Sequence, residues 1–103
     1  MDIYFYVEEN PYSPKKEYSI RYTQKFYDIF NYTESSYRVY EARLFGLSFA
    51  QYLRMTRDLY GGRIIGTGHK YPRVYFPEKE KAQKLARELN NRLTYVLKNL
   101  NIK

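Results

Sequence analysis

The chain has 103 residues, of which 44% are hydrophobic and none is cysteine, and its formal net charge is +7. This length and apolar content fit a single domain, residues 1–103, and the lack of cysteine excludes disulfides and cysteine-ligated zinc. Residues 1–46 carry 6 Lys+Arg against 7 Asp+Glu, a net of −1, whereas residues 47–103 carry 12 against 4, a net of +8. Clustered cations attract polyanions, so the composition first favours binding to nucleic acid.

The N-terminal part has the pattern of a hairpin. Residues 2–7 are rich in aromatic and β-branched side chains and are followed by a proline-containing break, which predicts a strand and a loop. Residues 17–23 alternate large apolar and polar side chains, which predicts a second strand with one buried face. The periodicity then weakens, and we expect a short helix, a loop at residues 31–36 and a strand over residues 37–45. The apolar residues of this last segment fit a helical period as well as a strand period, and we favour the strand.

The clearest local signal predicts a helix over residues 49–60. Ser48 and Gln51 have the spacing of a capping box, and apolar residues follow at helical intervals. Gly61 stands where the pattern ends, as expected for a C-terminal cap.

The rest of the chain predicts a second hairpin and a long helix. Two short apolar runs, residues 63–65 and 73–76, flank a loop rich in glycine and basic residues. Residues 82–100 have apolar side chains at i, i+3, i+4 and i+7, which predicts an amphipathic helix with Asn90-Asn91 as its weak point. The whole chain therefore predicts an α+β fold, in which two principal helices pack on a small, mostly antiparallel sheet in the order ββ(α)βαββα.

Enzymatic chemistry has little support in the sequence. His69 is the single histidine and falls on a predicted hairpin tip, where an exposed turn residue or a phosphate contact beside Lys70 is a simpler interpretation than a general base. Glu8 and Glu9 are adjacent, so they would point to opposite faces of a strand and would not form a metal site. The glycines of residues 66–70 lack the Gly-Lys-Ser/Thr ending of a phosphate-binding loop. We expect a non-enzymatic protein with no catalytic residues, no cofactor and no metal.

A basic helix followed by a basic hairpin is the more informative pattern. Five Lys and Arg residues occur between residues 54 and 73, and one aspartate opposes them. Cations suit phosphate oxygens, and a helix beside a hairpin is a layout used to bind DNA, although a solvated surface would also explain each charge singly. We predict DNA, RNA or a protein–nucleic acid complex as the partner. The predicted nucleic-acid-binding residues are Arg54, Arg57, Arg63, His69, Lys70 and Arg73.

Tyrosine is the second compositional bias, since 9 of the 14 tyrosines lie within the first 40 residues. Tyrosine combines a large contact area with a polar tip and is enriched at interfaces, but alternating tyrosines in strands are often core residues. We expect about half of them to be structural. The remainder fit a homodimer face, a protein-binding patch or a stacking platform for bases, and the sequence leaves these alternatives open. The predicted protein-binding residues are Tyr4, Tyr6, Tyr18 and Tyr22.

Two resemblances add to these expectations. Ala42, Gly46-Leu47-Ser48 and the helix that follows resemble the spacing of helix-turn-helix proteins, and residues 42–90 loosely resemble an excisionase-like winged helix, which implies nucleic-acid binding. The short, basic, tyrosine-rich chain also resembles small accessory proteins of bacteriophages and mobile elements, including anti-CRISPR inhibitors. That resemblance implies an inhibitor that binds a host nuclease complex through its tyrosine-rich N-terminal half. No apolar run is long enough to span a membrane, so we expect a cytoplasmic protein, in the host cytoplasm if phage-encoded, without a membrane partner.

Overall fold

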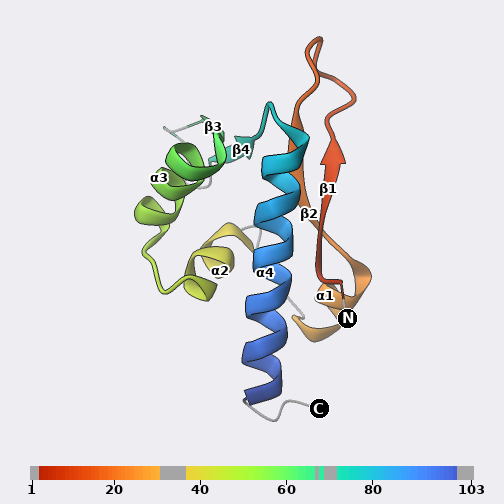
Figure 1. Cartoon of the computed structure of the whole chain (residues 1–103), viewed down its shortest axis with the longest axis vertical. Helices are drawn as coiled ribbons and strands as arrows, with labels where there is room; N and C mark the ends of the chain where they lie inside the picture. The colour runs from red at the N-terminus through yellow and green to blue at the C-terminus, as the bar shows by residue number, and fades with distance from the viewer. Residues whose placement is uncertain (1–2, 31–36, 67, 69–71, 100–103) are drawn as a thin grey trace.

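A computed structural model describes residues 3–30, 37–66, 68 and 72–99 of the chain (Figure 1). The elements in chain order are β1 (Phe5–Glu9), β2 (Tyr18–Tyr22), α1 (Gln24–Ile29), α2 (Tyr37–Leu44), α3 (Phe49–Tyr60), β3 (Arg63–Ile65), β4 (Arg73–Tyr75) and α4 (Lys79–Asn99). Within these residues there are four helices and two antiparallel two-stranded sheets, which confirms the predicted α+β class.

Residues 37–44 form the helix α2, so the strand predicted over residues 37–45 is wrong. Tyrosine and valine favour strands in this segment, but that preference depends strongly on context. Here Glu41 and Ala42 are both buried at 1% exposure, and Arg38 lies one helical turn before Glu41, with 3.7 Å between their charged atoms. A helix places these contacts on one side of the segment, and they outweigh the intrinsic strand preference.

Both predicted hairpins are confirmed, and the structure joins them at one point. β1 and β2 pair in register from Phe5 opposite Tyr22 to Glu9 opposite Tyr18, and β3 pairs with β4 in the same antiparallel sense. Tyr18 and Phe76 then exchange two backbone hydrogen bonds of 2.8 Å. The N-terminal hairpin is therefore anchored to the end of β4.

Helix α4 lies between the β1–β2 hairpin on one side and α2 and α3 on the other (Figure 1). Its buried residues are Ala82, Leu85, Ala86, Leu89, Asn90 and Leu93. Asn90 Oδ1 accepts hydrogen bonds from the backbone N–H groups of Tyr4 (2.7 Å) and Phe5 (2.9 Å), and Asn90 Nδ2 donates to the carbonyl of Phe5 (2.9 Å). The predicted weak point of the helix is thus the place where α4 is bonded to the edge of β1.

Candidate nucleic-acid interface

Helices α2 and α3 are joined by a tight turn at residues 45–48. Backbone hydrogen bonds of 3.0 Å close this turn, one from Gly46 to the carbonyl of Arg43 and one from Leu47 to that of Ala42. Gly46 has a φ of 68°, a left-handed conformation that glycine adopts without strain. Two helices joined by a short glycine turn are the arrangement that a helix-turn-helix requires.

Helix α3 has the bounds and both of the caps that the sequence predicts. Gln51 N–H donates to Ser48 Oγ (3.2 Å), and Ser48 N–H donates to Gln51 Oε1 (3.0 Å). Gly61 ends the helix with a φ of 67°, and the next residue packs closely: a Cβ on Gly62 would lie 2.9 Å from Val74 Cγ1. The β3–β4 hairpin is therefore held directly against the end of α3.

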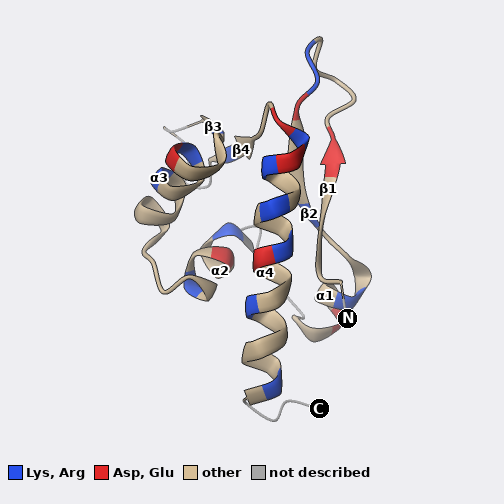
Figure 2. Ribbon diagram, in the orientation of Figure 1, with Lys and Arg blue, Asp and Glu red and all other residues tan. Residues whose placement is uncertain are grey.

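One face of α3 is buried and the opposite face carries cations. Tyr52, Thr56 and Tyr60 point into the protein, whereas Arg54 and Arg57 are exposed. Figure 2 marks basic residues along α3 in blue. The side chain of Arg54 makes no hydrogen bond or ion pair with any other residue that the structure describes. Its guanidinium is therefore available to an anionic ligand.

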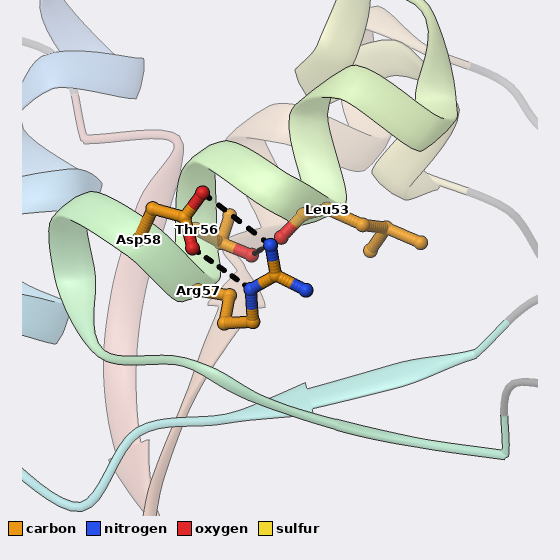
Figure 3. Close-up of polar contacts among 4 residues, drawn as sticks. All are labelled: Leu53, Thr56, Arg57 and Asp58. Atoms are coloured by element: carbon orange, nitrogen blue, oxygen red, sulfur yellow. Dashed lines mark hydrogen bonds and ion pairs between the residues drawn. The ribbon is translucent and has the colours of Figure 1, made fainter.

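Arg57 is paired with the neighbouring Asp58 (Figure 3). Arg57 Nε donates to Asp58 Oδ1 (2.8 Å) and Nη2 donates to Oδ2 (3.4 Å). The hydrogen bond from Arg57 lowers the pKa of Asp58 and the same bond raises the pKa of Arg57. Both side chains are more than half exposed, at 56% and 60%, so water and salt screen the pair. Arg57 can therefore exchange this partner for a phosphate. Arg54 forms no ion pair in the described residues, although its charge helps to lower the pKa of Asp58.

The cations predicted in the hairpin have different surroundings from those of α3. Arg63 forms an ion pair with Glu17, whose side chain is largely buried near the start of β2. Arg73 is exposed and lines a cavity of about 320 Å³ between the two hairpins. His69 and Lys70 lie outside the described residues. Of the predicted set, only the two arginines of α3 share one helix face in the described structure.

A buried polar cluster connects α2 and α3 to β2. Glu41 accepts hydrogen bonds from the hydroxyl groups of Tyr22 and Tyr52, the second at 2.6 Å, and Arg38 Nη1 lies 3.7 Å from Glu41 Oε2. Burial, and then the charge of Glu41, raise the pKa of both phenols well above the usual value. The two phenols therefore stay protonated and donate their hydrogen bonds to Glu41. The cluster fixes the positions of α2 and α3 relative to the N-terminal hairpin. The sequence interpretation missed it, although the i, i+3 spacing of Arg38 and Glu41 is a helical signal.

A second polar cluster holds the α2–α3 turn from the side of α4. Arg92 Nη1 donates to the carbonyl of Leu44 (3.3 Å), and its guanidinium carbon lies 4.1 Å from the centroid of the Phe45 ring. Glu88 accepts from Arg92 (3.4 Å) and from the hydroxyl of Tyr60 (2.5 Å). Burial, and then the bond to Glu88, raise the pKa of Tyr60 to about 12. The end of α2 and the end of α3 are thereby both bonded to α4.

The four tyrosines predicted to contact protein are in different environments. Tyr4 is buried at 4% exposure, and Tyr18 and Tyr22 are half-buried against the core. Tyr6 is 41% exposed, and Tyr12, which was not among the predicted residues, is 92% exposed. A protein contact through Tyr6 stays a prediction.

Comparisons with protein-family models, curated proteins and solved structures found no match. In the described part of the chain, no three His, Asp or Glu side chains are grouped so that they could hold a metal ion. None of the helices in these same ranges is both long and apolar enough to cross a bilayer. Functional interpretation therefore rests on the geometry of α2, α3 and the β3–β4 hairpin.

Proposed function

We propose that this protein binds duplex DNA, with α3 in the major groove and the β3–β4 hairpin beside it. The observation that carries the proposal is the succession of α2, a glycine turn, α3 with an exposed arginine face, and a hairpin packed against the end of α3. In helix-turn-helix proteins the second helix lies in the major groove. The resemblance to excisionase-like winged helices implies the same order of elements.

The charge of this region supports the proposal. Residues 49–76 contain five Lys and Arg residues and one aspartate, a net of 5 − 1 = +4. Contacts from cations to phosphates supply most of the affinity of DNA-binding proteins, and contacts to base edges supply the specificity. Arg54, on the exposed face of α3 and without a described ion-pair partner, suits either kind of contact.

The rigidity of the helix pair is a second supporting feature. Glu41 bonds α2 to α3 from within, and Arg92 bonds the end of α2 to α4. A recognition helix that is already held in position loses little conformational freedom on binding, which favours affinity.

The helical geometry favours duplex DNA over duplex RNA. The major groove of B-DNA is about 12 Å wide and admits an α-helix. The major groove of A-form RNA is deep and narrow, so α3 would not reach its base edges. We therefore expect weaker binding to an RNA duplex of the same sequence.

Titration of fluorescently labelled duplex DNA at several salt concentrations tests the proposal. We expect Kd to rise steeply with salt, and Arg54→Gln to weaken binding about tenfold or more, because a direct arginine contact is worth about 1–3 kcal/mol. Lys98→Gln removes the same charge at the C-terminal end of α4 and serves as the matched control, with Kd expected to change by about twofold at most. Absence of DNA binding at low salt, or equal losses in the two variants, would contradict the proposal.

Inhibition of a nuclease complex through the tyrosine-rich half has less support than DNA binding. Tyr4, Tyr18 and Tyr22 contribute to the core or pack against it, so they offer little free contact area. Tyr6 and Tyr12 are the exposed tyrosines of the N-terminal hairpin.

A further inference from the structure

A groove of about 450 Å³ lies between the end of α2 and the C-terminal half of α4. Its lining residues are Leu44, Glu88, Asn91, Arg92, Tyr95 and Val96. Tyr95 is 68% exposed, although aromatic side chains of this size are usually buried to a larger extent. No residue of α3 lines the groove, so it is distinct from the proposed DNA-binding face.

Helix α4, which forms one wall of this groove, carries an excess of positive charge. Residues 81–99 contain five Lys and Arg residues and one glutamate, a net of 5 − 1 = +4. The glutamate, Glu88, already accepts hydrogen bonds from Tyr60 and Arg92, so its charge is partly compensated. Lys84 and Lys98 share a helical stripe with Tyr95, and neither forms an ion pair within the ranges that the structure describes.

We propose that this groove binds an acidic segment of a partner protein that inserts a bulky apolar side chain beside Tyr95. Carboxylates on such a segment complement the surrounding cations, and the apolar side chain fills the groove. Exposed tyrosine and arginine in one pocket are also the residue types that dominate binding energy at protein interfaces.

Two other occupants fit the groove less well. A second copy of this chain, related by a two-fold axis, would use the same surface on both copies. The cations of one copy of α4 would then face the cations of the other. Duplex DNA would satisfy the cations, but it would leave the apolar lining of Leu44, Tyr95 and Val96 without a matching surface.

This inference does not depend on DNA binding. The exposed face of α3 and the groove share no residue, so neither site requires the other. Failure of DNA binding would leave the inference untouched, and failure of the inference would leave DNA binding untouched.

Fluorescence anisotropy with a synthetic helical peptide tests the inference. The probe carries Leu and Phe one helical turn apart and Glu at its other positions, and the comparison peptide carries Lys in place of each Glu. We expect the Glu peptide to bind, the Lys peptide not to bind, and Tyr95→Ala to weaken binding about tenfold or more, because it removes the exposed aromatic anchor. Tyr12→Ala removes a tyrosine from the β1–β2 loop that is even more exposed than Tyr95, and it should leave binding unchanged. The inference would be overturned if the Glu peptide did not bind or if the Lys peptide bound equally well. It would also be overturned if Tyr95→Ala and Tyr12→Ala lost peptide affinity to the same extent.

Amide chemical-shift mapping locates the peptide independently of any variant. With ¹⁵N-labelled wild-type protein and the Glu peptide, we expect the largest changes at residues 91–96 and near Leu44. Changes centred on α3 or on β1–β2 would overturn the inference. So would a Tyr95→Ala variant that altered self-association or DNA affinity while leaving peptide binding intact.

Discussion

Glu41 is a carboxylate with 1% exposure, and such burial is costly unless the charge is compensated. Two phenol donors and one guanidinium surround it, from β2, α3 and α2. Arg54 is in the opposite situation, since it is exposed and has no described ion-pair partner. The first residue therefore belongs to the fold, and the second is free to act on a ligand.

We predict that Glu41→Gln lowers the free energy of unfolding by about 1–3 kcal/mol. The amide keeps one acceptor oxygen, but it brings N–H donors against groups that already donate, and it leaves Arg38 without its counter-charge. Urea denaturation measures the change. Glu9→Gln, at an exposed position of β1, is the control and should stay within about 0.5 kcal/mol of wild type. A loss in Glu41→Gln no larger than that of the control would show that the cluster does not stabilise the helix pair.

At the scale of elements, the sequence predicted those helices that have strong local signals. The capping box at Ser48 and Gln51 and the left-handed Gly61 define α3, and apolar periodicity defines α4. The helix α2 was mistaken for a strand, because its burial depends on partners distant in the chain, chiefly the hydroxyl groups of Tyr22 and Tyr52. Single-segment periodicity contains no information about such partners.

Asn90 and Asn91 form a natural matched pair for testing how α4 holds β1. Asn90 makes three hydrogen bonds to the backbone of Tyr4 and Phe5, whereas the side chain of Asn91 is exposed. We predict that Asn90→Ala lowers the free energy of unfolding by about 2–4 kcal/mol, because it leaves buried backbone groups unpaired.

The control for this prediction is the neighbouring substitution. Asn91→Ala should change the free energy of unfolding by about 0.5 kcal/mol at most, since it alters an exposed position in a helix. Thermal or urea denaturation of both variants provides the comparison. If both variants lost a similar amount of unfolding free energy, the hydrogen bonds from Asn90 to β1 would contribute nothing to stability beyond helix propensity.

At the scale of the whole molecule, much of the positive charge of the C-terminal half is divided between α3 and α4. Arg54 and Arg57 are exposed on α3, and Lys84 and Lys98 lie on the stripe of α4 that contains Tyr95. Figure 2 marks basic residues along both helices. Composition predicted the excess of charge but not this division, because the division depends on which side of each helix is buried against the core. Composition is equally limited in what it predicts for the tyrosines. Their number is evident from the sequence, but the burial of Tyr4 and the exposure of Tyr12 follow from the hairpin geometry.

Amide chemical-shift mapping of a duplex DNA complex is the most direct test of the proposed function. We predict the largest changes on the exposed side of α3, around Arg54 and Arg57, and in β3 and β4, with small changes in β1 and at residues 91–96. Changes confined to the β1–β2 hairpin or to α4, or no change at low salt, would contradict the assignment of α3 as the helix that enters the major groove.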